Sequence, residues 1–242
     1  MLRSNRKNEL TSLTSFPREE FIRERWDYKP GEHVTFLGST GSGKTTLGFE
    51  LLQATVNPKL PAIVLVAKPR DPVIKAHKER FDFKMVRRWP PPLTSLRKPP
   101  GWILWPRTEF DPEKDESHFA EEFRKAILWA NRHGNNIIFA DDVFKLIDLG
   151  LSRELVMVWS TGRSMGSGLW VLTQKPSHIP LWAYNQAEHL FLAYEADERG
   201  RKRFAEIGGI SGVDIETHVS KLKRYEWLYI KRTGLHMCVI LP

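Results

Sequence analysis

The sequence predicts an α/β domain whose mostly parallel sheet is covered by helices on both faces. Strand-length apolar runs alternate along the chain with segments of helical periodicity, which is typical of this class. The run at residues 62–67 (AIVLVA) has no polar alternation, as expected of a strand that is buried on both sides. A glycine-rich turn also joins the first predicted strand to a helix. The 242 residues are enough for one large domain with a full core.

The chain begins with a polar segment. Residues 1–30 mix charges with weak periodicity and end at Pro30-Gly31, so we expect an N-terminal arm that is mobile or docked on a partner. The first strand of the domain is expected at residues 33–37, the first helix at about 43–54, and further strands at 62–67 and 102–105.

The rest of the chain repeats this alternation. Apolar residues in 117–133 recur at the spacing of one helical face, and Gly134 follows where that helix should end. A strand is then expected at 136–140, a helix at 151–164, and strands at 169–173 and 187–194. Two last runs, 225–231 and 236–241, flank a Thr-Gly turn and predict a C-terminal β-hairpin.

The composition excludes several classes of protein. The single cysteine, Cys238, rules out an internal disulfide framework. No apolar run approaches the ~20 residues that cross a bilayer, and no hydrophobic stretch follows the basic N-terminus. We therefore expect a cytoplasmic protein with no membrane segment and no secretory signal. The 37 Lys and Arg exceed the 29 Asp and Glu by 8, which suggests an anionic partner.

Most of this charge lies in one segment, Lys68–Lys98, which holds ten basic and three acidic residues and has a net charge of +7. The segment is either a solvated face or a surface that binds a polyanion, and charge alone does not decide between them. Prolines at 90–92 and 99–100 keep part of this region out of regular helix or central strand. The candidate residues for binding a polyanion are Lys84, Arg87, Arg88, Arg97 and Lys98.

A phosphate-binding motif follows the first predicted strand. The residues GSTGSGKT at 38–45 match the pattern G-x-x-x-x-G-K-[ST] at every fixed position. Glycines let the backbone wrap closely around a phosphate, and its N–H groups form an anion site at a helix N-terminus. Lys44 would bridge the β- and γ-phosphates of ATP, and the Thr45 hydroxyl would hold Mg²⁺. The predicted ATP-binding residues are Gly38, Ser39, Thr40, Gly41, Ser42, Gly43, Lys44, Thr45 and Thr46.

Two carboxylates follow the strand expected at residues 136–140. In a nucleotide hydrolase the first, Asp141, would hold the metal together with Thr45, and the second, Asp142, would sit where a general base activates water. The alternative is a pair of aspartates that cap the next helix or turn, which is common at strand ends. The phosphate-binding motif favours the catalytic interpretation.

A third strand end carries an amide. The stretch GRSMGSGLWVLTQKP at 162–176 places a basic residue before a glycine-flanked turn, and then an apolar strand that ends in Gln174. Ligands bind beyond the carboxyl ends of the strands in open α/β sheets, so Gln174 is expected beside the phosphates. There it would sense the γ-phosphate or help to place the attacking water.

Together, the motifs GSTGSGKTT, IIFADD and GRSMGSGLWVLTQKP resemble those of the FtsK/HerA superfamily of ring-forming, DNA-pumping ATPases, over roughly residues 32–210. The resemblance implies a P-loop ATPase domain of the RecA/ASCE type at residues 31–242, with ATP and Mg²⁺ as ligands. It implies a homo-oligomeric ring of five or six subunits that moves double-stranded DNA. It also implies that Arg163, with Arg153 as the fallback, reaches a neighbouring subunit's ATP site. The predicted catalytic residues are then Lys44, Asp142, Arg163 and Gln174.

This chain departs from the superfamily in two respects. The superfamily usually has Glu where this chain has Asp142, so another residue is an alternative general base. The short stretch after residue 210 and the lack of a membrane anchor make viral genome-packaging ATPases the nearest resemblance, with a portal or capsid component as a candidate partner. The alternatives are an ATPase for filamentous phage assembly or plasmid transfer, a P-loop nucleotide kinase, and a nucleotide-dependent scaffold without turnover.

Overall fold

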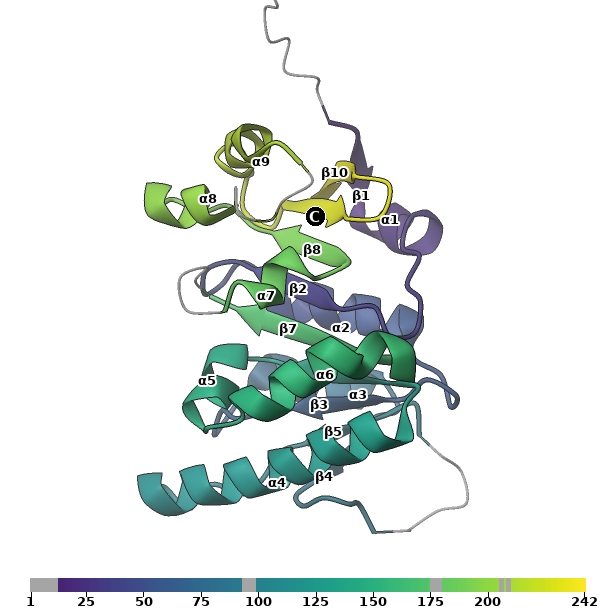
Figure 1. The fold of residues 1–242 in the computed structure, drawn as a ribbon, viewed down its shortest axis with the longest axis vertical. Coiled ribbons are helices and arrows are strands. Elements are labelled where there is room, and N and C mark those ends of the chain that lie inside the picture. The colour runs from purple at the N-terminus through teal and green to yellow at the C-terminus, as the bar shows by residue number, and fades with distance from the viewer. Residues whose placement is uncertain (1–12, 93–98, 175–179, 205–206, 208–209) are drawn as a thin grey trace, which may run out of the picture.

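The computed structural model describes residues 13–92, 99–174, 180–204, 207 and 210–242 (Figure 1). Within these residues ten strands form one sheet. In spatial order they are β1 (Ser15–Pro17), β10 (His236–Leu241), β9 (Trp227–Lys231), β8 (His189–Leu192), β2 (Val34–Leu37), β7 (Ser167–Thr173), β6 (Asn136–Ala140), β3 (Ala62–Leu65), β5 (Gly101–Leu104) and β4 (Lys84–Val86). Neighbouring strands are parallel except where β9 pairs with β8 and β10. The predicted fold class, with its C-terminal hairpin, is confirmed.

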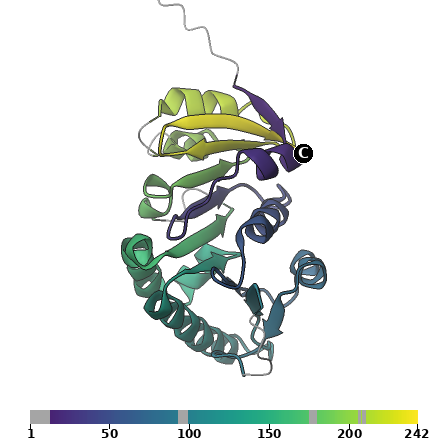
Figure 2. The ribbon, with the colours of Figure 1, turned by 90° about the vertical axis from the view of Figure 1, so that its right-hand side faces the viewer.

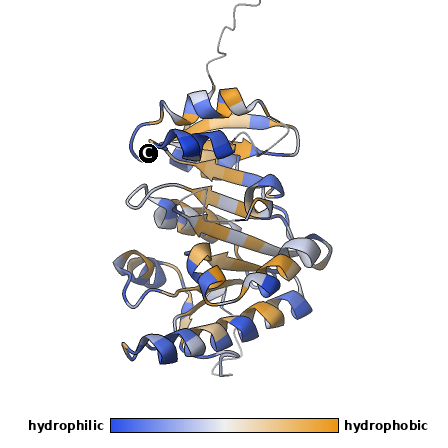
Figure 3. Cartoon of the chain, turned by 60° about the vertical axis from the view of Figure 1, so that its left-hand side comes forward, coloured by the Kyte–Doolittle hydropathy of each residue, from blue (hydrophilic) through white to orange (hydrophobic). Residues whose placement is uncertain are grey.

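Helices cover both faces of the sheet (Figure 2). One face carries α4 (Pro112–His133), α5 (Val143–Asp148), α6 (Ser152–Met165), α7 (Trp182–Asn185), α8 (Glu198–Phe204) and α9 (Gly212–Val219); the other carries α1 (Arg18–Glu24), α2 (Lys44–Thr55) and α3 (Pro72–Arg80). Ile63 and Leu65 of β3 pack in the first core, whereas Ala62 and Val64 pack in the second. Two apolar cores explain the unbroken apolar run of β3. Figure 3 shows the strands mostly in hydrophobic colours, with hydrophilic residues along the surrounding helices.

The longest helix, α4, begins five residues before the predicted start at 117. Asp111 caps it by accepting a hydrogen bond from the Lys114 N–H, and Pro112 occupies the first turn, which is a favoured N-terminal pattern. The expected apolar face is buried, including Phe123 and Ile127. Among the described residues, no helix is both long and apolar enough to cross a membrane.

Part of the predicted N-terminal arm belongs to the sheet. From Ser15 to Pro17 the chain pairs with β10, and Phe21 of α1 is fully buried against Phe191 and Tyr229. The arm from Ser15 onward is therefore docked on its own chain, and the domain boundary at residue 30 stays a prediction. This contact joins residues more than 200 positions apart, which local sequence periodicity does not reveal.

The sheet order brings the three predicted motifs together. Strand β7 lies between β2 and β6, although it follows both in sequence. All three run parallel, so their carboxyl ends meet at one edge. The phosphate-binding loop follows β2, Asp141 and Asp142 follow β6, and Gln174 follows β7.

Candidate active site

The phosphate-binding loop joins β2 to α2 in a conformation that needs glycine. Gly41 and Gly43 have φ angles of 79° and 89°, a region that residues with a side chain disfavour. Gly43 is the N-cap of α2, and no side chain of the described residues caps this helix, whereas Asp71 and Asp111 cap α3 and α4. The backbone N–H groups of the first turn of α2 are thus left for an anion.

Two further features of the loop fit a phosphate group. A Cβ at Gly38 would lie 2.7 Å from the Ala193 Cβ and 2.8 Å from the Ser42 Oγ, so the loop has no room for a side chain there. The Ser42 Oγ is buried and has no hydrogen-bond partner among the described residues. A buried hydroxyl without a partner is costly, and a phosphate oxygen would satisfy it.

The ammonium group of Lys44 is folded back onto the loop. Its Nζ donates to the carbonyl oxygens of Gly38 (2.5 Å) and Ser39 (2.8 Å). Burial and the neighbouring Lys68 ammonium lower the pKa of Lys44 to about 8. A cation that is held by neutral oxygens and crowded by a second cation favours the arrival of a polyanion.

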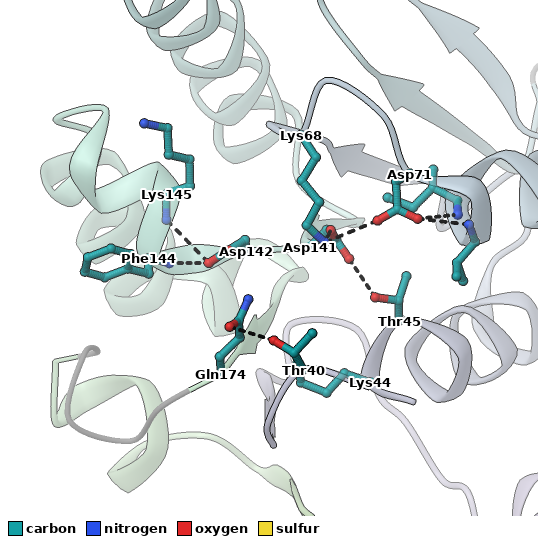
Figure 4. A network of polar contacts seen from close by, with 12 residues as sticks. Thr40, Lys44, Thr45, Lys68, Asp71, Asp141, Asp142, Phe144, Lys145 and Gln174 are labelled. Atoms are coloured by element: carbon teal, nitrogen blue, oxygen red, sulfur yellow. Dashed lines mark hydrogen bonds and ion pairs between the residues drawn. The ribbon is translucent and has the colours of Figure 1, made fainter. Parts of the chain in front are cut away.

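Thr45 and Asp141 meet as the predicted metal ligands. The Thr45 Oγ1, in the first turn of α2, lies 3.0 Å from the Asp141 Oδ1 at the end of β6 (Figure 4). The Asp141 side chain is only 1% exposed, and burial raises its pKa, an effect that the Lys68 ammonium and the Thr45 hydroxyl oppose. A hydroxyl and a carboxylate oxygen are hard ligands that suit Mg²⁺, which also keeps water and phosphate oxygens around it. The residues present therefore fit this ion.

Lys68 is a site residue that the sequence analysis missed. Its Nζ lies 2.5 Å from the Asp141 Oδ2 and 3.2 Å from the Asp71 Oδ2 (Figure 4). In the sequence Lys68 is only the start of the basic segment, but in the structure it lines a cavity together with Lys44, Thr45 and Asp141. The signal that could have found it is a Lys-Pro pair soon after the buried strand β3, at the sheet edge where the other motifs were expected.

Asp142 caps a helix, as the alternative interpretation proposed. Its Oδ1 accepts hydrogen bonds from the backbone N–H groups of Phe144 (3.2 Å) and Lys145 (3.5 Å), at the start of α5. Asp142 also lines the cavity that Lys68 lines. Both capping hydrogen bonds use Oδ1, and Oδ2 takes no part in them. The assignment of Asp142 as general base stays a prediction.

Gln174 lies beside the phosphate-binding loop, as expected from its strand. The Thr40 hydroxyl donates to its Oε1 at 3.0 Å (Figure 4). Both residues line a cavity of about 300 Å³, together with Lys44, Thr45 and Asp141. The cavity collects residues from β2–α2, β6 and β7, which is the convergence that the three motifs predicted.

Tyr225, just before β9, also lines this cavity, and the sequence motifs did not predict it. It is 39% exposed, and a Cβ at Gly43 would lie 3.3 Å from its ring. Its φ of 69° is unusual for a residue with a side chain. The Arg224 guanidinium lies 4.7 Å from the ring centroid. Strained residues cluster at functional sites, but this strain is visible only in three dimensions.

Arg163 is exposed in the last turn of α6, just before the amino-terminal end of β7, whereas the phosphate-binding loop lies at the carboxyl ends of the strands. Its backbone lies against Gly31, just before β2, where a Cβ would be 2.9 Å from the Arg163 Cα. Strand β7 has seven residues and separates the two ends, a length of ~20 Å that an arginine side chain does not cross. Arg163 is thus not part of the cavity beside the phosphate-binding loop of its own chain. The fallback residue, Arg153, is exposed in the first turn of α6.

The described DNA-binding candidates lie at the β4 edge of the sheet. Lys84 is half-buried, and Arg87 and Arg88 are exposed; Arg97 and Lys98 lie outside the described residues. A groove of about 1700 Å³ runs along this edge. Among its described lining residues seven are basic and two are acidic, namely Lys59, Lys78, Lys84, Arg87, Arg88, Arg107 and Lys114 against Glu109 and Asp115. The basic segment is thus divided between this groove, α3 and, through Lys68, the cavity beside the phosphate-binding loop.

No family model matches this chain, and no curated protein sequence matches it. Solved structures of P-loop ATPases do match, and the chain has their fold, as the resemblance predicted. The genome packaging NTPase B204 from Sulfolobus turreted icosahedral virus 2, in complex with AMPPCP, is 15% identical, with a TM-score of 0.58 over 89% of this chain and 100% of B204. VirB4 of Thermoanaerobacter pseudethanolicus is 10% identical, with a TM-score of 0.61 over 87% of this chain and 90% of VirB4.

Proposed function

We propose that this chain hydrolyses ATP with Mg²⁺ and uses the reaction to move double-stranded DNA, as a homo-oligomeric ring. The observation that carries the ATPase proposal is the contact of 3.0 Å between Thr45 and Asp141. It joins a phosphate-binding helix to a buried carboxylate, and Lys44 and Gln174 line the same cavity. These are the parts that phosphoryl transfer to water requires.

Each residue has a chemical role in this proposal. Lys44 would leave the carbonyl oxygens of the loop and bind the β- and γ-phosphates. Mg²⁺ bound at Thr45 and Asp141 would neutralise negative charge on the phosphate oxygens. Gln174, held by Thr40, would orient the attacking water, and the second carboxylate oxygen of Asp142 would accept its proton.

The position of Arg163 supports a ring. Because it lies near the amino-terminal end of β7, it would act only in a neighbouring subunit, as an arginine finger that stabilises charge on the transferring phosphoryl group. Each ATP site would then be complete only between two subunits. This arrangement would couple hydrolysis in one subunit to the position of the next.

Two observations support DNA as the polymer that is moved. One similar structure is described as the DNA-packaging ATPase B204 from Sulfolobus turreted icosahedral virus; it is 19% identical, with a TM-score of 0.55 over 89% of this chain and 99% of B204. The groove beside β4 is strongly basic, as binding to a phosphate backbone requires. A portal or capsid component would be a further partner in genome packaging.

A second candidate function is transport of a protein. The cytoplasmic domain of the Thermomonospora curvata type VII secretion ATPase EccC has a TM-score of 0.53 at 15% identity, over 88% of this chain and 25% of EccC. A secretion ATPase would share the nucleotide site and would not respond to DNA.

The test is the ATPase rate with and without duplex DNA at several salt concentrations. DNA should stimulate hydrolysis, and the affinity for DNA should fall steeply with salt. Changing Lys84, Arg87 and Arg88 to Gln should reduce the logarithmic salt slope by about 2–3. The matched control changes Arg199 and Lys202 of α8, at the opposite end of the sheet, and should leave the slope unchanged. An ATPase rate that is the same with and without DNA would overturn the proposal and favour the protein-transport function.

A further inference from the structure

Two lysine ammonium groups face the ATP-site cavity, and the phosphate-binding motif accounts for only one of them. Lys44 belongs to the motif, whereas Lys68 comes from the loop after β3. Their mutual repulsion contributes to the lowered pKa of Lys44. Like charges that crowd one cavity mark a site for a polyanion with more than one phosphate group.

Lys68 is held so that its ammonium group has two partners. Its backbone oxygen accepts a hydrogen bond of 2.7 Å from the Trp105 Nε1, which fixes the residue at the end of β3. The Nζ contacts Asp141 at 2.5 Å and Asp71 at 3.2 Å. Asp71 itself is fixed, because its Oδ1 caps α3 through the N–H groups of Val73 and Ile74 at 3.0 Å each. Lys68 can therefore leave Asp141 and stay near Asp71.

The contact between Lys68 and Asp141 conflicts with a metal ion at Asp141. A divalent cation bound to this carboxylate would repel an ammonium group that sits 2.5 Å from the other oxygen. Asp141 cannot move away easily, since its side chain is 1% exposed, whereas that of Lys68 is 38% exposed. We therefore expect the Lys68 side chain to move away from Asp141 when the metal binds, and to move into the cavity that it lines.

We propose that Lys68 is a second γ-phosphate-binding lysine, which exchanges the Asp141 carboxylate for the γ-phosphate when ATP and Mg²⁺ bind. This inference rests on the proposed ATPase function. ADP has no γ-phosphate to hold the ammonium group, which returns to Asp141 once phosphate and Mg²⁺ have both left. Lys68 thereby distinguishes ATP from ADP.

The test measures equilibrium binding of AMPPCP and of ADP, with Mg²⁺ and without DNA, by calorimetry. The variant Lys68→Met keeps the aliphatic stem and removes the ammonium group. It should weaken AMPPCP binding about ten- to a hundredfold, the range for one charge-assisted hydrogen bond, and leave ADP binding nearly unchanged. Lys68→Arg should recover most of the loss. The matched control, Lys75→Met, changes an exposed lysine on α3 and should change neither affinity.

Three results would overturn this inference. Equal weakening of both nucleotides would indicate a merely structural role, and unchanged AMPPCP binding would indicate no role. Tighter binding of both would mean that Lys68 only competes with Mg²⁺ for Asp141. If Lys68→Met does not fold, Lys68→Gln carries the same test. Lys68→Met could lose affinity for AMPPCP alone while DNA leaves the ATPase rate of the native protein unchanged. That result would support the role of Lys68 and refute the DNA motor, so the two proposals can fail separately.

Discussion

Replacing Asp141 with Asn should abolish hydrolysis without weakening the fold. The amide keeps the shape of the side chain and an oxygen that can accept from Thr45, which lies 3.0 Å away. It removes the negative charge that would hold Mg²⁺. We expect the ATPase rate to fall at least about a hundredfold, as when a group that stabilises transition-state charge is lost.

The effect on stability follows from burial. The raised pKa of Asp141 means that the fold disfavours its charged form. Removing one partner of a buried ion pair is destabilising where the other charge is left buried and unpaired. Lys68 is 38% exposed and keeps Asp71 at 3.2 Å, so we expect the free energy of unfolding to stay equal or rise by about 1 kcal/mol. For a chain of this size that is a rise in Tm of roughly 2–4 °C.

The pH dependence of the stability tests independently whether Asp141→Asn stabilises or destabilises the fold. A carboxyl group with a raised folded-state pKa contributes stability at low pH and loses it as pH rises through that pKa. The two proteins should be equally stable below the ordinary Asp pKa of 3.8, and the advantage of the variant should appear as pH rises.

Thermal unfolding and the steady-state ATPase rate are the assays for this prediction. The control is Asp142→Ala, which removes the side-chain cap of α5 and should cost about 0.5–2 kcal/mol. A Tm several degrees lower for Asp141→Asn, or a nearly native rate, would refute the reasoning.

Three further predictions concern single residues. Arg163→Ala subunits mixed with native ones should lower the ATPase rate more than in proportion, whereas Arg153→Ala should not; strict proportionality would exclude a finger shared between subunits. Tyr225→Ala should weaken ATP, ADP and AMP alike, about five- to thirtyfold if the ring stacks on the base, and Tyr225→Phe should not; an effect on ATP alone would contradict this. Burial lowers the pKa of His33 from its ordinary 6.5 to about 4, so its neutral form contributes stability that is lost as pH falls through that range. In urea unfolding this loss should be about 3 kcal/mol and absent from His33→Gln, and equal losses in both proteins would refute it.

Local patterns predicted the elements and the three motifs, but not every residue of the site. The loop at Gly38 and the strand ends at Asp141 and Gln174 follow from spacing and from the rule that parallel strands end at one edge. The role of Lys68 depends on β3 lying beside β6, which is a long-range pairing. Tyr225 reaches Gly43 across more than 180 residues, and no short-range pattern encodes that contact.

The basic segment, Lys68–Lys98, also contains residues whose surroundings depend on contacts that are distant in sequence. Trp89 lies within this segment beside Arg87 and Arg88, and the sequence leaves open whether such a residue binds a ligand or packs in a loop. In the structure Trp89 is 4% exposed and packs against Trp102 and Trp129, so it is a core residue. The charged residues around it lie beside β4, the strand at the end of the sheet, which pairs with β5; this position depends on a pairing that local sequence patterns do not reveal.

Movement along DNA is the central claim, and displacement of a third strand tests it most directly. A labelled oligonucleotide is bound as a triplex at one end of a linear duplex, and its release is followed after ATP is added. We expect release of the third strand with ATP, and none with AMPPCP or with Asp141→Asn. A third strand that stays bound while DNA-stimulated hydrolysis proceeds would contradict translocation.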